Sequence, residues 1–306
     1  MQSRVLPGLG RHDTRRLGFI PPKLRATLRA GVDTWGEWTS SLRVMPSYLI
    51  VGAMRSGTSA LYEYLVRHPA VARSTTEEVH YFTLRYDKGP AWYRGHFPSR
   101  LRREHVRRRY GLELVTGEAT PYYLFHPHAP GRIASLLPDV KLIVVLRDPV
   151  DRAYSHYVHA RKVGVEPLPT FEEALAAEPR RLAGEVEKMH ADPGYRSRNH
   201  WHFAYVGRGI YVDQLQRLLS LFARDQILVL QAEEMLRATR DVHARVLGFL
   251  GLPVMTLGNY AQHNRSRYSP MKIETRRRLA ETFEEPNRRL YDLLGVDYAW
   301  GASPAR

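Results

Sequence analysis

The chain of 306 residues contains no cysteine. That absence excludes disulfide bonds, thiolate zinc sites, iron–sulfur clusters and cysteine nucleophiles. The chain also lacks any run approaching the ~18–20 apolar residues that a membrane-spanning helix requires. Residues 1–40 contain no continuous apolar stretch that ends in a small-residue cleavage site, as a secretory signal would. We therefore expect neither a membrane span nor export, and the absent thiols leave the redox compartment open.

Positive charge is abundant instead, because the formal net charge is +15 at neutral pH. Such a balance favours polyanionic partners, including nucleotides, nucleic acid, acidic glycans and anionic lipids, although many surface arginines only solvate helix faces. A nucleic-acid-binding module would gather basic residues with exposed aromatics on one face. Here they are dispersed along the chain, which favours an enzyme and predicts no nucleic-acid partner.

Three regions differ in their patterns. Residues 1–46 mix proline, glycine and arginine without a sustained period and are predicted to be an N-terminal arm. Residues 47–306 alternate short apolar runs with amphipathic stretches, which predicts an α/β domain with a P-loop-like, doubly wound parallel sheet flanked by helices. Within it, residues 163–209 are polar and broken by prolines, and we expect a lid, an insert or plain surface decoration there.

The predicted strands are short runs rich in β-branched and aliphatic residues. They are Tyr48–Val51, Leu112–Val115, Lys141–Leu146 and Gln226–Leu230. The first leads through a glycine-bearing turn into a helix that Pro69 is expected to stop.

That turn has the features of a phosphate-binding loop. Gly52 and Gly57 have the spacing of a Walker A motif, but Thr58 stands where that motif has lysine. Arg55 supplies a cation from within the loop instead, and the loop and helix start would present donors to a phosphate; these are Ser56, Gly57, Thr58 and Ser59. A P-loop nucleotide kinase or NTPase is the rival interpretation, which the missing lysine disfavours. A turn of this kind also occurs in α/β proteins that bind no anion.

A second anion site is predicted at the end of the third strand, where Arg147 is followed eight residues later by Ser155. Because the carboxyl ends of parallel strands line one crevice, Arg147 and Arg55 would open onto the same site. Two anchors suit a ligand that is phosphorylated at two places. Alone, the Arg-Asp-Pro sequence would more often be a salt bridge at a helix start.

These blocks together resemble the sulfotransferases that depend on 3′-phosphoadenosine-5′-phosphosulfate (PAPS), closest to the heparan sulfate and carbohydrate branch. The likeness covers about Ser47 to Trp300. It implies PAPS as donor, with Arg55 in the 5′-phosphosulfate loop and Arg147 and Ser155 at the 3′-phosphate. A small-molecule or glycan acceptor would receive the sulfuryl group on a hydroxyl or amine, and no metal is expected.

The resemblance also implies an acceptor-side base. Thr76–Phe82 is similar to the segment that carries the base in heparan sulfate enzymes, which places Glu78 in that role and His80 beside it. His80 is the alternative base, because imidazole is a common general base at neutral pH. A surface carboxylate at Glu78 and a packed histidine at His80 remain the structural alternatives. Glu118 would either orient an acceptor or hold a nearby arginine.

Near the carboxyl terminus, Arg265, Ser266 and Arg267 resemble the family's basic loop that closes over the cofactor, although a solvated loop is the alternative. Two departures matter: Ala119 replaces a common lysine, and Thr83 replaces an acidic residue found in some relatives. The acceptor contacts of the family therefore do not transfer. Because animal members are usually anchored to membranes and this chain shows no anchor, we expect a cytoplasmic, bacterial enzyme.

Overall fold

The computed structural model describes residues 31–260 and 270–301. Its centre is a sheet of five strands in the order β2-β3-β1-β4-β5, and every pair is parallel. The strands are β1 (Tyr48–Gly52), β2 (Val71–Arg73), β3 (Val115–Ala119), β4 (Lys141–Leu146) and β5 (Ile227–Gln231). The predicted α/β class with a doubly wound parallel sheet is confirmed.

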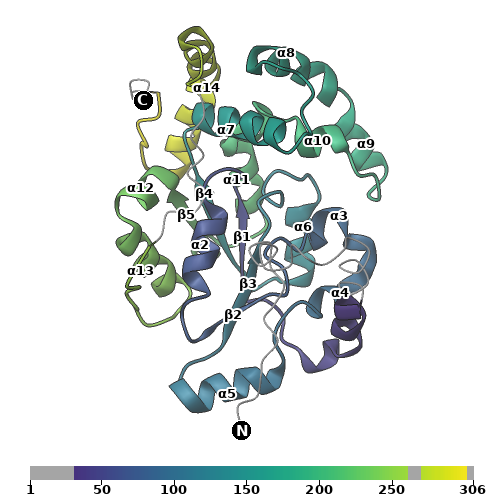
Figure 1. Ribbon diagram of the computed structural model, residues 1–306, viewed down its shortest axis with the longest axis vertical. Helices are drawn as coiled ribbons and strands as arrows, with labels where there is room; N and C mark the ends of the chain where they lie inside the picture. The colour runs from purple at the N-terminus through teal and green to yellow at the C-terminus, as the bar shows by residue number, and fades with distance from the viewer. Residues whose placement is uncertain (1–30, 261–269, 302–306) are drawn as a thin grey trace.

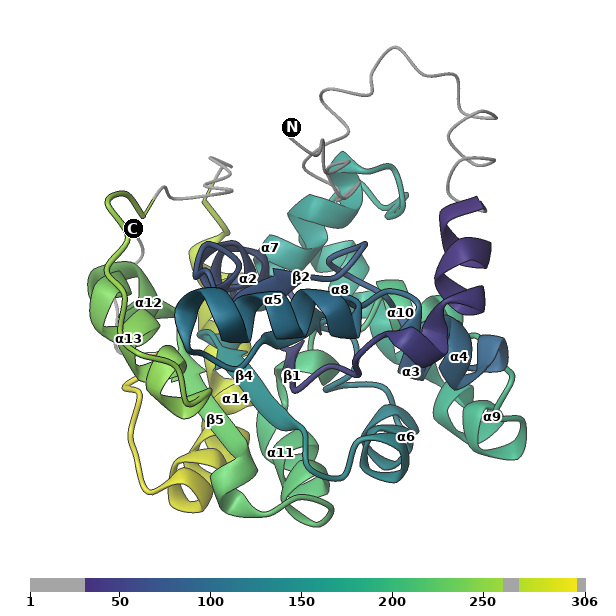
Figure 2. The same ribbon diagram turned by 90° about the horizontal axis from the view of Figure 1, so that it is seen from below.

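Helices cover both faces of the sheet (Figure 2). Alternate residues of β1 point to opposite faces, so Leu49 and Val51 join one core and Tyr48 and Ile50 the other. The first core is closed by α6 (Ala129–Leu136), α11 (Tyr211–Leu219) and α14 (Ile273–Leu294). The second is closed by α2 (Thr58–Leu65), α5 (Arg100–Tyr110), α12 (Ala232–Arg237) and α13 (Thr239–Phe249).

The remaining helices lie around the carboxyl ends of the strands and beside β2 and β3 (Figure 1). They are α3 (Tyr81–Leu84), α4 (Gly89–Arg94), α7 (Pro149–Lys162), α8 (Phe171–Leu182), α9 (Glu185–Ala191) and α10 (Arg198–His202). Residues 163–209, predicted as a lid or insert, thus form α8, α9 and α10. Phe171, Leu175 and Phe203 from this segment pack with α7 in a third apolar cluster.

One strand prediction was inaccurate, and one strand was missed. Leu112–Val115 was expected to be a strand, but β3 starts at Val115 and continues through Gly117 and Glu118, residues that ordinarily disfavour strands. Gly117 is required because a Cβ there would lie 2.2 Å from the carbonyl oxygen of Tyr48 in β1. Strand β2 was missed because Val71–Arg73 is too short to show a period.

Among the described residues, no helix is both long and apolar enough to cross a membrane.

Candidate functional site

The turn between β1 and α2 has the backbone of an anion cradle. Arg55 and Gly57 have φ angles of 72° and 93°, in the left-handed region that few side chains adopt freely. Among the described residues, no side chain caps the start of α2, so its first N–H groups are available to a ligand. The Ser56 hydroxyl is buried and has no hydrogen-bond partner within residues 31–260 and 270–301. Thr58 begins the helix and is buried, and Ser59 is partly exposed.

Three predicted anion-binding residues meet beside this turn. Arg55 donates from Nε to the Ser155 hydroxyl over 3.2 Å, although the residues are 100 positions apart. Arg147, at the end of β4, donates from a terminal nitrogen to the Arg55 carbonyl oxygen over 3.2 Å. The fold therefore brings together one residue from the β1 turn, one from the end of β4 and one from α7.

The Arg-Asp-Pro sequence was considered as a salt bridge at a helix start. In the structure, its Asp148 caps the following helix. Its Oδ1 accepts the N–H groups of Val150 at 2.8 Å and Asp151 at 3.4 Å, and so caps the start of α7. Burial raises the pKa of this carboxyl. The cap fixes the helix that carries Ser155.

Glu78 and His80 lie together in the segment between β2 and α3. Glu78 Oε2 is 3.0 Å from His80 Nε2, and the side chains are 27% and 14% exposed. Both groups are thus accessible yet joined to each other. His80 has a left-handed φ of 58°, and its ring contacts the Trp201 ring edge-on at 5.7 Å between centroids. A carboxylate and an imidazole in this arrangement can accept and share a proton.

Glu118 in β3 holds this segment in place. Its fully buried carboxylate accepts the Val79 N–H at 3.0 Å, between Glu78 and His80. Hydroxyl donors complete its shell: Thr120 at 2.5 Å, Tyr93 at 3.2 Å and Tyr123 at 2.6 Å. Burial raises the pKa of Glu118, and the donors from Thr120, Tyr123 and Val79 counteract that rise. The sequence left open whether Glu118 holds a nearby arginine. Among the described residues, none of the hydrogen bonds of this carboxylate comes from an arginine.

Sequence reasoning missed Arg208, which contacts Met54 of the turn and interacts with the charge of Glu78. Its guanidinium lies over the rings of Tyr122 and Phe125, 4.7 and 5.0 Å from their centroids. It donates to the Trp201 carbonyl oxygen over 2.7 Å and approaches the Met54 sulfur of the loop at 3.6 Å. Burial lowers its pKa to about 10, while the charge of Glu78 is one of those that oppose the shift. The only signal in the sequence is an arginine flanked by glycines.

The buried histidines beside Arg208 predict a loss of stability in acid. Burial lowers the pKa of His126 to about 2 and that of His200 to about 3. Below pH ~6.5 the histidines of the unfolded chain bind protons, whereas these two histidines of the folded protein do not. Each of them therefore lowers the free energy of unfolding by about 1.4 kcal/mol for every pH unit below that point. Urea unfolding should therefore show lower stability at pH 5.5 than at pH 7.5.

His126→Asn tests that expectation. Asparagine can still accept the His128 N–H that His126 Nδ1 accepts over 3.2 Å. Between pH 7.5 and pH 5.5, the free energy of unfolding of the variant should fall by about 1 kcal/mol less than that of the wild type. Equal losses in the two proteins would contradict the assignment to His126.

Arg265, Ser266 and Arg267 lie outside the described residues. Their predicted contact with the cofactor is therefore not addressed by the geometry.

Comparison with known proteins identifies a family. The family model described as "Sulfotransferase domain" matches residues 45–287. Human heparan sulfate glucosamine 3-O-sulfotransferase 6 is 31% identical, with 85% of this chain and 75% of the relative aligned. The human enzyme 3B1 is 30% identical over 85% of this chain and 66% of its own length. The membrane-associated sulfotransferase kil1 of Dictyostelium discoideum is 24% identical, over 85% and 67%.

A solved structure agrees with these sequence relatives. The sulfotransferase from Alicyclobacillus acidocaldarius is 30% identical with a TM-score of 0.63, over 84% of this chain and 99% of that chain. This chain spans about two thirds to three quarters of the length of the curated relatives above. The matched region includes the phosphate loop, Glu78, Arg147 and Ser155. From the family match and the shared fold, the chain belongs to the sulfotransferase family.

Proposed function

We propose that this protein transfers a sulfuryl group from PAPS to a hydroxyl or amine of a carbohydrate acceptor. The observation that carries the proposal is the junction of Arg55, Ser155 and Arg147. It sets cations and a hydroxyl from three elements beside one phosphate loop. PAPS carries a 3′-phosphate and a 5′-phosphosulfate on one nucleoside, so its binding requires two neighbouring anion sites.

The residues present fit that donor. Arg147 and Ser155 would bind the 3′-phosphate, and Arg55 with the start of α2 would bind the 5′-phosphosulfate. The Ser56 hydroxyl, buried without a partner in the described part of the chain, offers another donor at the loop, since an unsatisfied buried hydroxyl is costly without a ligand. The lysine of a Walker A motif is absent at Thr58, which disfavours a nucleotide kinase.

The chemistry then needs positioning, a base and charge neutralisation. Glu78 accepts the proton of the acceptor as the new bond to sulfur forms and the bond from sulfur to the 5′-phosphate oxygen breaks. Arg55 balances the negative charge that grows on that oxygen. His80 shares a hydrogen bond with Glu78 and is the alternative base.

The acceptor assignment draws on the relatives and on charge. Relatives named for heparan sulfate glucosamine support a carbohydrate, and the net charge of +15 suits an acidic one. Ala119 stands where relatives commonly have a lysine, so that cation is absent at this position. Arg208, which interacts with the charge of Glu78, would supply a cation near the acceptor in its place. The cytoplasmic location and the absence of a nucleic-acid partner stay predictions.

Calorimetry with nucleotides tests the donor site. The wild-type protein should bind 3′,5′-adenosine diphosphate more tightly than 5′-AMP or ATP. Arg147→Ala should weaken binding of 3′,5′-adenosine diphosphate by about 10- to 100-fold, because it removes a charge-assisted hydrogen bond. Its affinity for 5′-AMP should change little if the loop keeps its shape.

Arg278→Ala, at an exposed position of α14, controls for the general loss of one positive charge and should leave all three affinities unchanged. Equal or tighter binding of ATP would overturn the proposed function in favour of a nucleotide kinase or NTPase.

A further inference from the structure

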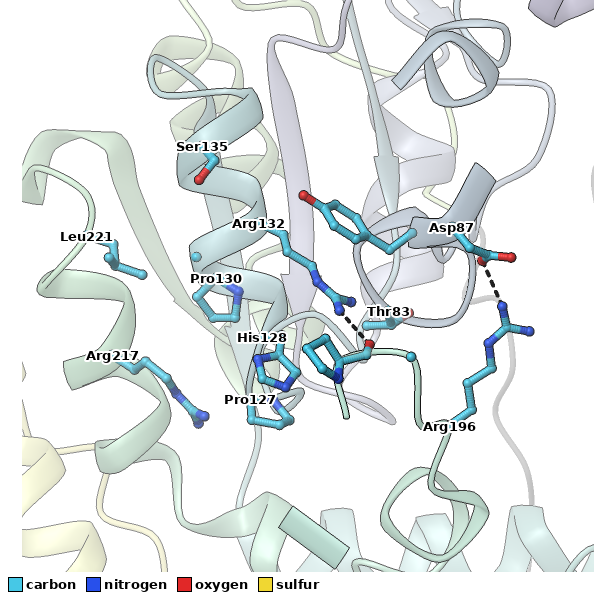
Figure 3. A pocket seen from close by; sticks show the side chains of 14 residues that line it. Thr83, Asp87, Pro127, His128, Pro130, Arg132, Ser135, Arg196, Arg217 and Leu221 are labelled. Atoms are coloured by element: carbon cyan, nitrogen blue, oxygen red, sulfur yellow. Dashed lines mark hydrogen bonds and ion pairs between the residues drawn. The ribbon is translucent and has the colours of Figure 1, made fainter. Parts of the chain in front are cut away.

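A pocket of about 820 Å³ lies apart from the phosphate loop. Figure 3 shows its walls, with Arg132 and Ser135 from α6, Arg217 from α11, and Arg196 from the loop that joins α9 to α10. Asp87, His128, Thr83 and Tyr86 also contribute polar groups to the lining. We refer to the site lined by these residues as the basic pocket. Its volume is within the ~300–1,000 Å³ of small-molecule sites.

Positive charge exceeds negative charge in the basic pocket. Its lining includes three guanidinium groups and one carboxylate. The carboxylate, Asp87, is paired with Arg196 over 2.7 Å. The excess charge therefore lies on Arg132 and Arg217.

Arg132 is held rigidly at the inner wall. It is 9% exposed and donates to the carbonyl oxygens of Phe82 at 3.0 Å and Pro193 at 2.8 Å. Its guanidinium stacks 4.2 Å from the Tyr86 ring centroid. These bonds use only part of a group that has five N–H donors. Arg132 thus joins α6, α3 and the loop before α10, with donors left over.

Arg217 is bound less firmly than Arg132. No hydrogen bond or ion pair of its guanidinium is found within residues 31–260 and 270–301, and the side chain is half-buried. The carboxylate one turn earlier, Asp213, pairs with Arg289 over 2.9 Å, and its charge also acts on Arg217. Burial lowers the pKa of Arg217 by more than the charge of Asp213 raises it, which reflects the cost of desolvating the guanidinium. An anion in the pocket would offset that cost.

The basic pocket adjoins the segment that carries the base. Thr83 lines it, and its hydroxyl lies 3.3 Å from the His80 carbonyl oxygen and 3.4 Å from His80 Nδ1. Pro193 and Arg196, from the loop between α9 and α10, also line it. A ligand there would contact both the segment that carries Glu78 and His80 and this loop.

From these contacts we infer that the basic pocket binds a carboxylate or sulfate group of a saccharide, with Arg217 as its donor and the charge of Arg132 in support. That the ligand is a saccharide rests on the proposed function. That it carries an anionic group rests on the charges of the pocket itself. The anionic group would belong either to the acceptor or to a separate saccharide ligand.

Calorimetry with small sugars tests the inference. The protein, saturated with 3′,5′-adenosine diphosphate to fill the phosphate loop, is titrated with glucose 6-sulfate, glucuronic acid or neutral glucose. The anionic sugars should bind at least about tenfold more tightly than glucose, because each charge-assisted hydrogen bond contributes that much or more. Arg217→Gln should weaken their binding by about tenfold.

Two further variants make the result decisive. Ser135→Glu puts a carboxylate at an exposed position of the pocket wall, where it should repel the anionic sugars without affecting folding. Arg278→Gln, which removes an exposed arginine of α14, should change nothing. Equal binding of glucose and the anionic sugars, or unchanged binding in both Arg217→Gln and Ser135→Glu, would overturn the inference.

A heparin-derived tetrasaccharide distinguishes the two sources. Competition with glucose 6-sulfate means that a glycan acceptor reaches the pocket, whereas simultaneous binding means a separate saccharide ligand; either result supports the site. If 3′,5′-adenosine diphosphate fails to bind at all, the proposed function fails. The difference between the wild type and Arg217→Gln still reports the pocket in that case.

Discussion

Glu78→Gln should lower kcat for sulfuryl transfer by about 10²–10⁴-fold, the usual contribution of a general base. The amide cannot take the proton of the acceptor, but it keeps the size of the carboxyl and can still bond to His80. Because Glu78 lies outside the phosphate loop, the affinity for 3′,5′-adenosine diphosphate should stay within twofold. Steady-state kinetics and calorimetry on the same preparation measure both quantities.

Two control variants separate Glu78 from its neighbours. Glu77→Gln removes the adjacent carboxylate, whose charge acts on Arg73 and Tyr62, and should change kcat by less than threefold. His80→Asn retains a residue that tolerates the left-handed φ of 58°. If Glu78→Gln keeps most of its turnover while His80→Asn loses it, the base is His80.

Glu118→Gln should reduce the free energy of unfolding by about 2–4 kcal/mol, an unusually large loss for so small a change. The carboxylate accepts from one N–H and from the hydroxyls of Thr120, Tyr93 and Tyr123. An amide turns one acceptor atom into a donor. Either the hydroxyls of Tyr93 and Tyr123 would have to reverse and give up donating to a charged carboxylate, or the Val79 N–H would face another donor. Urea unfolding at pH 7.5 measures the loss.

The same variant should also lower kcat, because Val79 lies between Glu78 and His80 and would lose its bond to Glu118. Glu104→Gln is the matched control, since Glu104 forms exposed pairs with Arg107 and Arg108 on α5, and such pairs contribute little. If Glu118→Gln and Glu104→Gln lower the free energy of unfolding equally, the buried hydrogen bonds of Glu118 do not stabilise the fold as predicted.

The sequence was sufficient to predict those elements and residues whose positions depend on neighbours along the chain. The β1 strand, the turn into α2 and the β4 strand all follow from local patterns, and parallel topology alone predicts that Arg55 and Arg147 meet. The position of Glu118 was not predictable, because a carboxylate inside a strand is stable only with donors from residues that are distant in sequence. Arg208 was missed for the same reason: its partners Met54, Tyr122 and Trp201 come from three separate segments.

The contacts of Arg208 couple two parts of the site. One guanidinium touches Met54 of the phosphate loop and the carbonyl oxygen of Trp201 in α10. Any displacement of α10 that admits an acceptor therefore also alters the packing of the loop that would bind the donor. Such coupling is reciprocal in free energy. The donor and the acceptor should thus influence each other's affinity through this one side chain.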